Sequence, residues 1–348
     1  MEWKIYKRRF KTEAKKNGVK EEVINSCLNY AKKLYDNQLP IIYDQTHLSL
    51  LLGINNGYLH GMSNSPNKFY RTFYINKRNG SKRRIDEPLP DLKKIQSWIL
   101  NEILYKVPCN AFAKAYIPNK SIKDNVRFHT KQQIVMTADI KNFFPSISTH
   151  KIINVFLEIG YSAPVAMILT KLSCLRGSLP QGAPTSAYLS NLIMRNFDKV
   201  ISKYCVENMI RYTRYADDLT FSGSFDIAKL LNTIDWNLKL IKLERNNEKL
   251  RIMRSGARQR VTGVITNEKL QLPREYRMKI RQEVYYVLKY GLSDHLNHTG
   301  VKDYNFLDYL RSLLGKINYV IYINPKDTKM TGYLEKINKL YNNEMHKT

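Results

Sequence analysis

The pattern of apolar and polar residues changes from helical to strand-like and back to helical along the chain. Over residues 1–40 the apolar side chains recur at helical spacing, which predicts helices with basic, solvated outer faces. One such stripe consists of Val23, Ile24, Cys27, Leu28 and Ala31. The segment THLSLLLGINNGYLHGM predicts two short helices, packed as a pair or, as the less common alternative, arranged as a helix-turn-helix.

Residues 68–85, KFYRTFYINKRNGSKRRI, alternate between apolar and polar side chains, and Asn79-Gly80 predicts a two-residue hairpin turn. Every charged residue of this segment is basic, which favours a finger that contacts phosphates. Pro88 and Pro90 end the hairpin, and an amphipathic helix is predicted to follow over residues 91–107.

The central part of the chain mixes strands and helices. The short apolar run QQIVMTAD, residues 132–139, predicts a buried strand with Asp139 at its C-terminal tip. Helices are expected over residues 149–159, 163–172 and 186–205, and MIRYTRYADDLTFSG reads as strand, tight turn and strand. Amphipathic helices close the chain near residues 274–290, 305–323 and 331–345.

Composition narrows the class of protein. Hydrophobic residues make up 43% of the chain, enough to bury real cores. There are 57 Lys and Arg against 30 Asp and Glu, a formal charge of +27, together with 24 Tyr. Cations bind phosphates and aromatic rings stack on unpaired bases, so this mixture favours a nucleic-acid binder. Charge alone leaves a basic ribosomal or membrane-surface protein open.

Cysteine spacing and hydropathy indicate the compartment. Cys27, Cys109, Cys174 and Cys205 lie far apart and form no CxxC pair, which argues against a zinc site or a disulfide framework. The basic N-terminus is not followed by an apolar segment of signal-peptide length, and no apolar run has the length of a membrane span. We therefore expect a soluble protein of a reducing cytosol with no membrane partner.

Two adjacent acids stand out in this basic chain. Asp217 and Asp218 repel each other unless solvent, a cation or protonation removes the cost. If the strand that ends in Asp139 lies beside their hairpin, three carboxylates meet and favour Mg²⁺. Two such ions can activate an attacking hydroxyl and stabilise a leaving pyrophosphate. The alternative is an ordinary solvated turn, because turns host Asp readily.

Four motifs resemble those of reverse transcriptases, in that family's order. YADD within RYTRYADDLTFSG resembles the catalytic hairpin, and ADIKNFFPSI resembles the first metal-binding motif. LPQGAPTSAYLSNL is similar to the nucleotide-side loop and helix, and SKRRIDEPLPDLKKIQSWIL to the fingers motif. The resemblance covers about residues 68–330 and implies an enzyme, an RNA-directed DNA polymerase and nucleotidyltransferase that uses dNTPs.

The resemblance also implies roles for individual residues. Asp139, Asp217 and Asp218 match the catalytic, metal-binding acids, which would hold two Mg²⁺ ions, with Mn²⁺ as a substitute. Residues that match the nucleotide-binding positions are Arg83, Arg84, Phe144, Gln181, Gly182 and Lys249.

Several of these roles have a structural alternative. Phe144 falls at the steric gate against a ribose 2′-hydroxyl, but either Phe143 or Phe144 could instead be ordinary core. The sequence does not distinguish Arg83 from Arg84 as the triphosphate ligand. Lys249 matches the lysine that protonates pyrophosphate, or is a solvated side chain.

Further motifs resemble the retron group of reverse transcriptases. Val261, Thr262 and Gly263 match its VTG element, and Asn125 and His129 match the spacing of its NAxxH element, with Val126 in place of the alanine. The resemblance implies that these five residues bind RNA; a packed or capping His129 is the alternative. The LPQG loop argues against the enzymes of diversity-generating retroelements, and group II intron enzymes are normally longer.

A retron-type enzyme implies further partners and a biological role. Its template and primer would be one structured noncoding RNA, and priming from an RNA 2′-hydroxyl would give branched RNA–DNA (msDNA). Retrons defend bacteria against phage, usually with a separate effector protein. The basic stretch 239–260 is suited to hold a folded RNA by its phosphates, or is a solvated helix face.

Two other functions remain open at this stage. One is a standalone group II-like reverse transcriptase without a dedicated RNA, and the other is a non-catalytic RNA-binding scaffold. The complete set of three acids disfavours the scaffold, because a decayed site has no reason to keep carboxylates that repel each other.

The expected fold class is α+β, a right-hand polymerase fold. It would have fingers, an antiparallel-sheet palm and an α-helical thumb, plus a short helical N-terminal extension. The expected boundaries are 1–66 for the extension, 67–133 for the fingers, 134–268 for the palm with inserted fingers helices at about 150–180, and 269–348 for the thumb.

Overall fold

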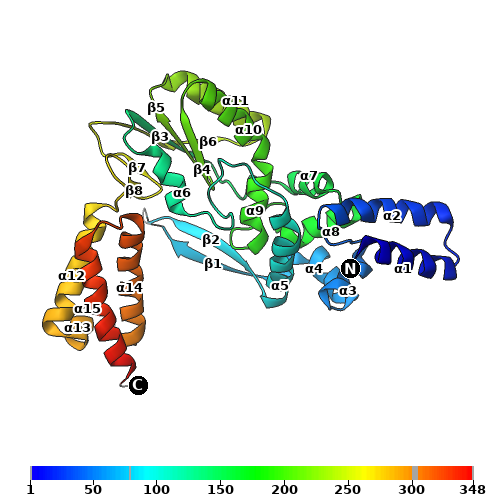
Figure 1. The fold of residues 1–348 in the computed structure, drawn as a ribbon, viewed down its shortest axis with the longest axis horizontal. Coiled ribbons are helices and arrows are strands. Elements are labelled where there is room, and N and C mark those ends of the chain that lie inside the picture. The colour runs from blue at the N-terminus through cyan, green and yellow to red at the C-terminus, as the bar shows by residue number, and fades with distance from the viewer. Residues whose placement is uncertain (1, 78–79, 300–304, 347–348) are drawn as a thin grey trace. The chain divides into compact units, whose positions relative to one another are not determined.

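The structure is a computed structural model that describes residues 2–77, 80–299 and 305–346 (Figure 1). The chain divides into two compact units, which are treated separately below. Unit 1 comprises Met1–Lys120, Asp139–Tyr204 and Ile227–Asn247, and unit 2 comprises Ser121–Ala138, Cys205–Asp226 and Glu248–Thr348. The division into extension, fingers, palm and thumb stays a prediction.

Unit 1 begins with the predicted helices. Helices α1 (Trp3–Lys16) and α2 (Glu21–Asp36) pack through aromatic rings, with Trp3 5.3 Å from Tyr35 between ring centroids (Figure 1). Helices α3 (Gln45–Leu52) and α4 (Asn56–Asn64) follow, and Asp44 and Asn55 accept hydrogen bonds from the backbone of their first turns. Side-chain caps of this kind define where a helix begins, so the predicted pair of short helices is confirmed.

The basic hairpin of unit 1 consists of β1 (Tyr70–Asn76) and β2 (Lys82–Pro88), preceded by a 3₁₀ turn (Pro66–Phe69). Its register pairs Asn76 with Lys82, and the amide of Lys77 donates to the carbonyl of Ser81. This register leaves an odd number of residues in the loop, so the predicted two-residue turn is wrong. Asn79 itself lies outside the described residues.

Further helices of unit 1 follow the basic hairpin along the chain. Helix α5 (Pro90–Trp98) continues as a π-helical turn (Ile99–Ile103) and a 3₁₀ turn (Leu104–Lys106). Helices α7 (Thr149–Ile159) and α8 (Ala163–Ser173) match their predicted ranges closely. The single helix predicted over residues 186–205 is instead two helices, α9 (Pro184–Ile193) and α10 (Arg195–Glu207), which meet at Met194. Helix α11 spans Ile227–Leu240.

A four-stranded sheet carries the predicted catalytic hairpin. Its strands are β4 (Arg211–Tyr215), β5 (Asp218–Gly223), β3 (Ile134–Ile140) and β6 (Arg245–Arg254), in the spatial order β4-β5-β3-β6. Strands β4 and β5 are antiparallel, with Tyr215 opposite Asp218. Within the basic stretch 239–260, Arg245–Arg254 forms a strand, so the alternative of a solvated helix face is wrong for that part; Lys239 lies on α11. Mixed helices and sheets confirm the α+β class.

The rest of unit 2 is mainly helical. Helix α6 (Ile122–Val126) and a 3₁₀ turn (Arg127–His129) precede the sheet in sequence, and the short hairpin of β7 (Arg260–Val261) and β8 (Val264–Ile265) follows it. The C-terminal helices are α12 (Arg274–Tyr290), α13 (Leu292–Thr299), α14 (Phe306–Ile323) and α15 (Thr328–Met345), so α13 adds to the three predicted (Figure 1).

One hydrophobic core holds unit 2 together. Val261 and Val264 of the small hairpin pack in the same core as Ile280, Leu313 and Ile317 of the C-terminal helices. Burying apolar area at roughly 25 cal/mol per Å² is the main force that fixes such an arrangement. Within the described residues, every helix falls short of the length or the apolar composition that crossing a bilayer requires.

Candidate active site

A buried arginine side chain fixes the turn that carries the adjacent acids. Ala216, at φ 59°, and Asp217 connect β4 to β5. The side chain of Arg214 is completely buried, and its Nη1 donates to the carbonyl oxygen of Ala216 at 3.0 Å. A buried guanidinium that donates to a turn carbonyl limits the movement of that turn, since breaking a hydrogen bond between buried groups costs free energy. Arg214 thus positions the two acids.

The structure brings together the three acids that the sequence predicted to meet. One carboxylate oxygen from each of Asp139, Asp217 and Asp218 lies within 4.8 Å of the others. Asp139 stands near the end of β3 and is 6% exposed, whereas the other two are partly exposed. Oxygen ligands of this type suit a hard divalent cation, and a cation would remove the repulsion among three negative charges. The donor set therefore fits a divalent metal.

The nucleotide-side loop packs against the basic hairpin within unit 1. The amide of Asp86 in β2 donates to the carbonyl of Gln181 at 2.9 Å. The next residue, Gly182, has φ 135°, and a Cβ there would lie 2.8 Å from the carbonyl oxygen of Asp86. Gly182 makes the close backbone approach that was expected of it, and the backbone it approaches is strand β2 of the same chain.

Contact with Asp86 distinguishes Arg84 from the adjacent Arg83. Arg84 donates to its carboxylate from Nε at 3.1 Å and from Nη2 at 2.8 Å, and Thr72 donates to it at 2.6 Å. Side chains two apart on a strand share a face, so Arg83 points to the opposite face from Arg84 and Asp86. Arg83 is exposed and forms no ion pair with any residue in the described ranges, which leaves it the better candidate for a phosphate ligand.

The two phenylalanines of the first metal-binding motif differ in burial. Phe143 is 3% exposed and belongs to the core, whereas Phe144 is partly exposed. Their ring centroids lie 5.5 Å apart. Phe143 therefore serves in packing, and Phe144 is the ring accessible to a ligand. Lys249 is an exposed residue of β6.

The VTG residues form the turn between β7 and β8 in unit 2. Val261 pairs with Val264, and Thr262 and Gly263 lie between them at φ 42° and 90°. Both positive angles match a type I′ hairpin turn, which a β-branched residue adopts only under strain. Asn125 Nδ2 donates to Thr262 Oγ1 at 3.3 Å. The strained turn is thus tied to α6.

The prediction that Asn125, His129 and Val261 contact RNA stays a prediction. All three side chains are completely buried in the structure, which does not favour contact through these side chains. The burial of His129 agrees with the alternative prediction that this residue is packed in the core. Of the five residues predicted to bind RNA, only Thr262 and Gly263 are partly exposed.

His129 hydrogen-bonds to both strands of the hairpin that carries Asp217 and Asp218. Its Nδ1 lies 2.7 Å from Ser222 Oγ in β5, and its Nε2 lies 2.8 Å from Thr213 Oγ1 in β4. Burial, assisted by the positive charge of Arg211, lowers the pKa of His129 to about 3. The ring therefore stays neutral at ordinary pH and connects the two strands that flank Asp217.

This buried histidine predicts a pH-dependent stability. In the unfolded chain His129 titrates near its ordinary pKa of 6.5, well above its folded value of about 3. The folded state binds fewer protons, so its stabilising contribution is complete above pH 6.5 and is lost as the pH falls toward 3. The expected loss is roughly 1.4 kcal/mol per pH unit in that window.

Urea unfolding at pH 7.5, 6.5 and 5.5 would measure this effect. His129→Gln replaces the imidazole with an amide, which can hydrogen-bond but does not titrate. The stability of this variant should therefore fall less steeply with decreasing pH than that of the wild type. Equal slopes for the two proteins would contradict the assignment.

A cavity of about 760 Å³ in unit 2 borders Asp218. Its lining includes Arg251, Arg258 and Arg260 together with Thr262 and Gly263. Arg258 is held by a bidentate ion pair with Glu275, at 2.9 and 2.8 Å. Arg251 and Arg260 place two further guanidinium groups in the lining that also includes Asp218, which favours a reactant that carries phosphate.

Sequence reasoning did not identify Arg214 or Asp86. A signal was present for both. Arg214 is an arginine at a strand position beside the two acids, and Asp86 is the first acid after a run of basic residues. Neither signal shows what the side chain will contact.

Comparison with known proteins agrees with the geometry. The family model for reverse transcriptases (RNA-dependent DNA polymerases) matches residues 75–301. The retron Ec86 reverse transcriptase of Escherichia coli is 30% identical over 279 residues, covering 78% of this chain and 82% of the relative. The retron Mx65 reverse transcriptase of Myxococcus xanthus is 33% identical over 268 residues, covering 70% and 62%.

A solved foamy viral protease-reverse transcriptase, in complex with double-stranded DNA, aligns with a TM-score of 0.42 and 16% identity. The alignment covers 79% of this chain and 44% of that one. This likeness is too low to support a conclusion by itself. The family match and the extended identity to retron enzymes show that the chain belongs to the reverse transcriptase family, in its retron group, and is an RNA-directed DNA polymerase.

Proposed function

We propose that this polymerase copies a cognate structured noncoding RNA and starts DNA synthesis from a 2′-hydroxyl of that RNA, giving branched RNA–DNA. The observation that carries the proposal is the cavity of unit 2, which joins Asp218 to the exposed part of the VTG turn. A reactant bound there touches a catalytic acid and a retron-type element together. The cavity would hold the priming nucleotide, with its phosphates on the arginines.

The three acids would hold divalent metal, which we propose to be Mg²⁺, with Mn²⁺ as a substitute. When bound, two such ions activate the attacking hydroxyl and stabilise the leaving pyrophosphate. Arg214 and His129 act indirectly by keeping the hairpin that carries Asp217 in place. Their role is to hold the acids in position before the substrate binds.

The incoming dNTP would be bound by residues of the hairpin and the nucleotide-side loop. Arg83 is proposed to contact the triphosphate, while Arg84 fixes the strand through Asp86. Gln181 and Gly182 set the distance between the loop and that strand. Lys249 is proposed to protonate the leaving pyrophosphate; its support is its match to the family's motif and its exposed place on β6.

Phe144 is proposed as the gate against ribonucleotides. A rigid ring against C2′ of the sugar clashes with one extra oxygen, so Phe144→Val should relax the discrimination against rNTPs by about tenfold to a hundredfold, a difference of ~1–3 kcal/mol. Steady-state incorporation of dCTP and CTP on the same primer–template would measure it. Phe143→Leu is the matched control, and if it relaxed discrimination as strongly as Phe144→Val, the assignment would fail.

Nucleic acid that copurifies with the protein tests the central proposal. Expression with the RNA from its native locus should yield one RNA–DNA species that resists separation by denaturation and releases its DNA when a debranching enzyme cleaves the 2′–5′ bond. Asp217→Asn should yield the RNA alone. Mixed cellular RNA without a branch would support the alternative, a group II-like enzyme with no dedicated RNA.

The proposed biological role is anti-phage defence with a separate effector protein. It rests on the resemblance to retrons, and the question is whether defence uses DNA synthesis or only RNA binding, with the protein acting as a scaffold. Phage plating on cells that carry the locus distinguishes these two. Defence that survives Asp217→Asn would favour the scaffold, and defence that requires the three acids would favour the enzyme.

A further inference from the structure

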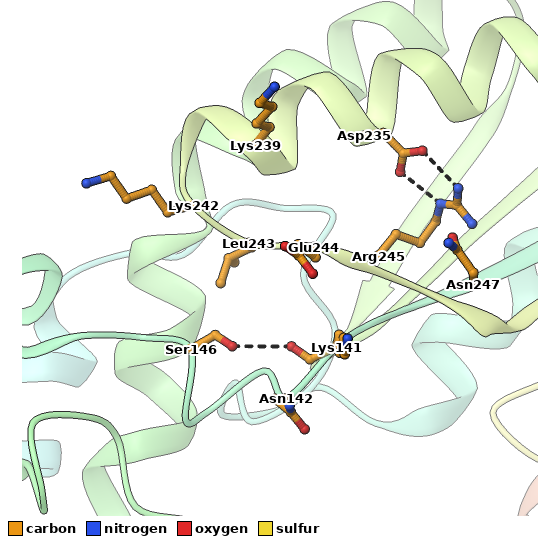
Figure 2. A pocket seen from close by; sticks show the side chains of 10 residues that line it. All are labelled: Lys141, Asn142, Ser146, Asp235, Lys239, Lys242, Leu243, Glu244, Arg245 and Asn247. Atoms are coloured by element: carbon orange, nitrogen blue, oxygen red, sulfur yellow. Dashed lines mark hydrogen bonds and ion pairs between the residues drawn. The ribbon is translucent and has the colours of Figure 1, made fainter.

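An open trough of about 890 Å³ lies in unit 1, where β3 ends (Figure 2). Its walls come from the segment after β3, the C-terminal turn of α11 and the start of β6. The amide of Lys141 donates to the carbonyl of Glu244 at 2.8 Å, which ties two of these segments together. The trough is distinct from the cavity beside Asp218, which lies in unit 2.

The trough carries an excess of positive charge. Arg245 is neutralised by a bidentate ion pair with Asp235, at 2.8 Å for both bonds (Figure 2). Lys141, Lys239 and Lys242 are exposed and form no ion pair with any residue in the described part of the chain. Figure 2 shows the ammonium groups of Lys239 and Lys242 extending away from the protein. Glu244 opposes them with one negative charge, so lysines remain in excess.

A fourth lysine near this site lacks a partner. Lys151 lies in the first turn of α7, and its Nζ is buried with no hydrogen-bond partner among the described residues. Burial lowers the pKa of Lys151, and the positive charge of Lys242 lowers it further. A buried donor without an acceptor costs free energy. An anion beside Lys151 and Lys242 would offset that cost.

We propose that this lysine trough binds the phosphodiester backbone of a nucleic-acid strand. No aromatic ring is among its lining residues, so it offers no surface on which a base could stack. Its cations stand on separate segments, which suits repeated phosphates better than one compact polyphosphate. The inference rests on the chain acting on nucleic acid and is independent of 2′-hydroxyl priming.

Salt dependence of binding tests the proposal. Lys239→Gln with Lys242→Gln should weaken the binding of a single-stranded RNA 20-mer to the full-length protein. Each lost phosphate contact lowers the slope of log K against log salt concentration by about 0.7, so the double variant should lose about 1.4. Fluorescence anisotropy without dNTPs or metal measures this slope. Because neither dNTPs nor metal are present, this assay measures RNA binding independently of catalysis and priming.

A matched control removes the same charge elsewhere in unit 1. Lys20 and Lys199 are exposed, and Lys20→Gln with Lys199→Gln should leave the slope within about 0.3 of wild type. An equal loss in both double variants would show a general charge effect and overturn the site. A raised KM for dNTP with unchanged RNA binding would assign the trough to polyphosphate and would also overturn the proposal.

Lys151→Met gives an independent test. Removing a buried, unpartnered ammonium should raise the melting temperature of the free protein, by about 2 °C or more. The same variant should reduce the rise in melting temperature that RNA produces. If Lys151→Met lowered the stability of the free protein and left the RNA-induced rise unchanged, the lysine would be structural and the proposal would fail.

Discussion

Asp217→Asn should slow DNA synthesis by about a thousandfold or more while leaving RNA binding intact. Asparagine keeps the shape of the side chain but removes one of three charges that lie within 4.8 Å of one another. Removing a single preorganised electrostatic group from an active site typically costs a factor of 10²–10³, and loss of a metal ligand costs at least that much. Single-turnover extension of a primed RNA template in Mg²⁺ measures the rate.

The same substitution should have an opposite effect on the stability of the metal-free protein. Without a cation the three carboxylates repel each other, so Asp139→Asn, Asp217→Asn and Asp218→Asn should each raise the melting temperature in EDTA. Each should also abolish the further rise that Mg²⁺ gives the wild type. Asp36→Asn, at an exposed position on α2, serves as the control. A variant of Asp139 that kept both activity and the Mg²⁺ effect would contradict the three-acid site.

Gly182→Ala should reduce kcat/KM for dNTP by about a hundredfold. The new Cβ would lie 2.8 Å from the carbonyl oxygen of Asp86, and φ is 135°. The nucleotide-side loop must then separate from β2, breaking the hydrogen bond from Asp86 to Gln181. A displacement of about 1 Å near reacting groups is enough for a loss of this size. Steady-state kinetics on a primed template provides the measurement.

Gly177 offers a matched control for the strain alone. It also has a positive φ, 78°, but an added Cβ there meets no atom within 4 Å. Gly177→Ala should therefore cost roughly 1 kcal/mol of stability from backbone strain and leave dNTP kinetics unchanged. If the two substitutions had equal effects on kcat/KM, the contact with Asp86 would not be what positions the loop.

Local periodicity was sufficient to predict most of the helices. Helix α7 occupies the predicted range, Thr149–Ile159, and α12 occupies the predicted range, Arg274–Tyr290. In both segments the apolar side chains that are buried recur at helical spacing, and that spacing is visible in the sequence. The meeting of Asp139 with Asp217 and Asp218 was expected from the resemblance to reverse transcriptases; from the residues alone it was expected only if their strands were neighbours.

Contacts between distant residues were not predictable. His129 reaches Thr213 across 84 positions and Ser222 across 93, and nothing in the short segment around it distinguishes a buried brace from an exposed ligand. The ion pair of Arg84 with Asp86 is local, yet it depends on which face of β2 each side chain occupies. Which of the two adjacent arginines shares a face with Asp86 follows only once residues 82–88 are known to form one strand.

Thr262 supplies a hydroxyl to the turn between β7 and β8 at the cost of backbone strain. An Asn-Gly turn would adopt the positive φ values of this hairpin with less strain than Thr-Gly. It would also replace the Oγ1 that accepts a hydrogen bond from buried Asn125. Directed evolution for thermostability would therefore favour substitution at residue 262, and selection for retron activity would oppose it. Residue 262 is therefore a site to look for a trade-off between stability and activity.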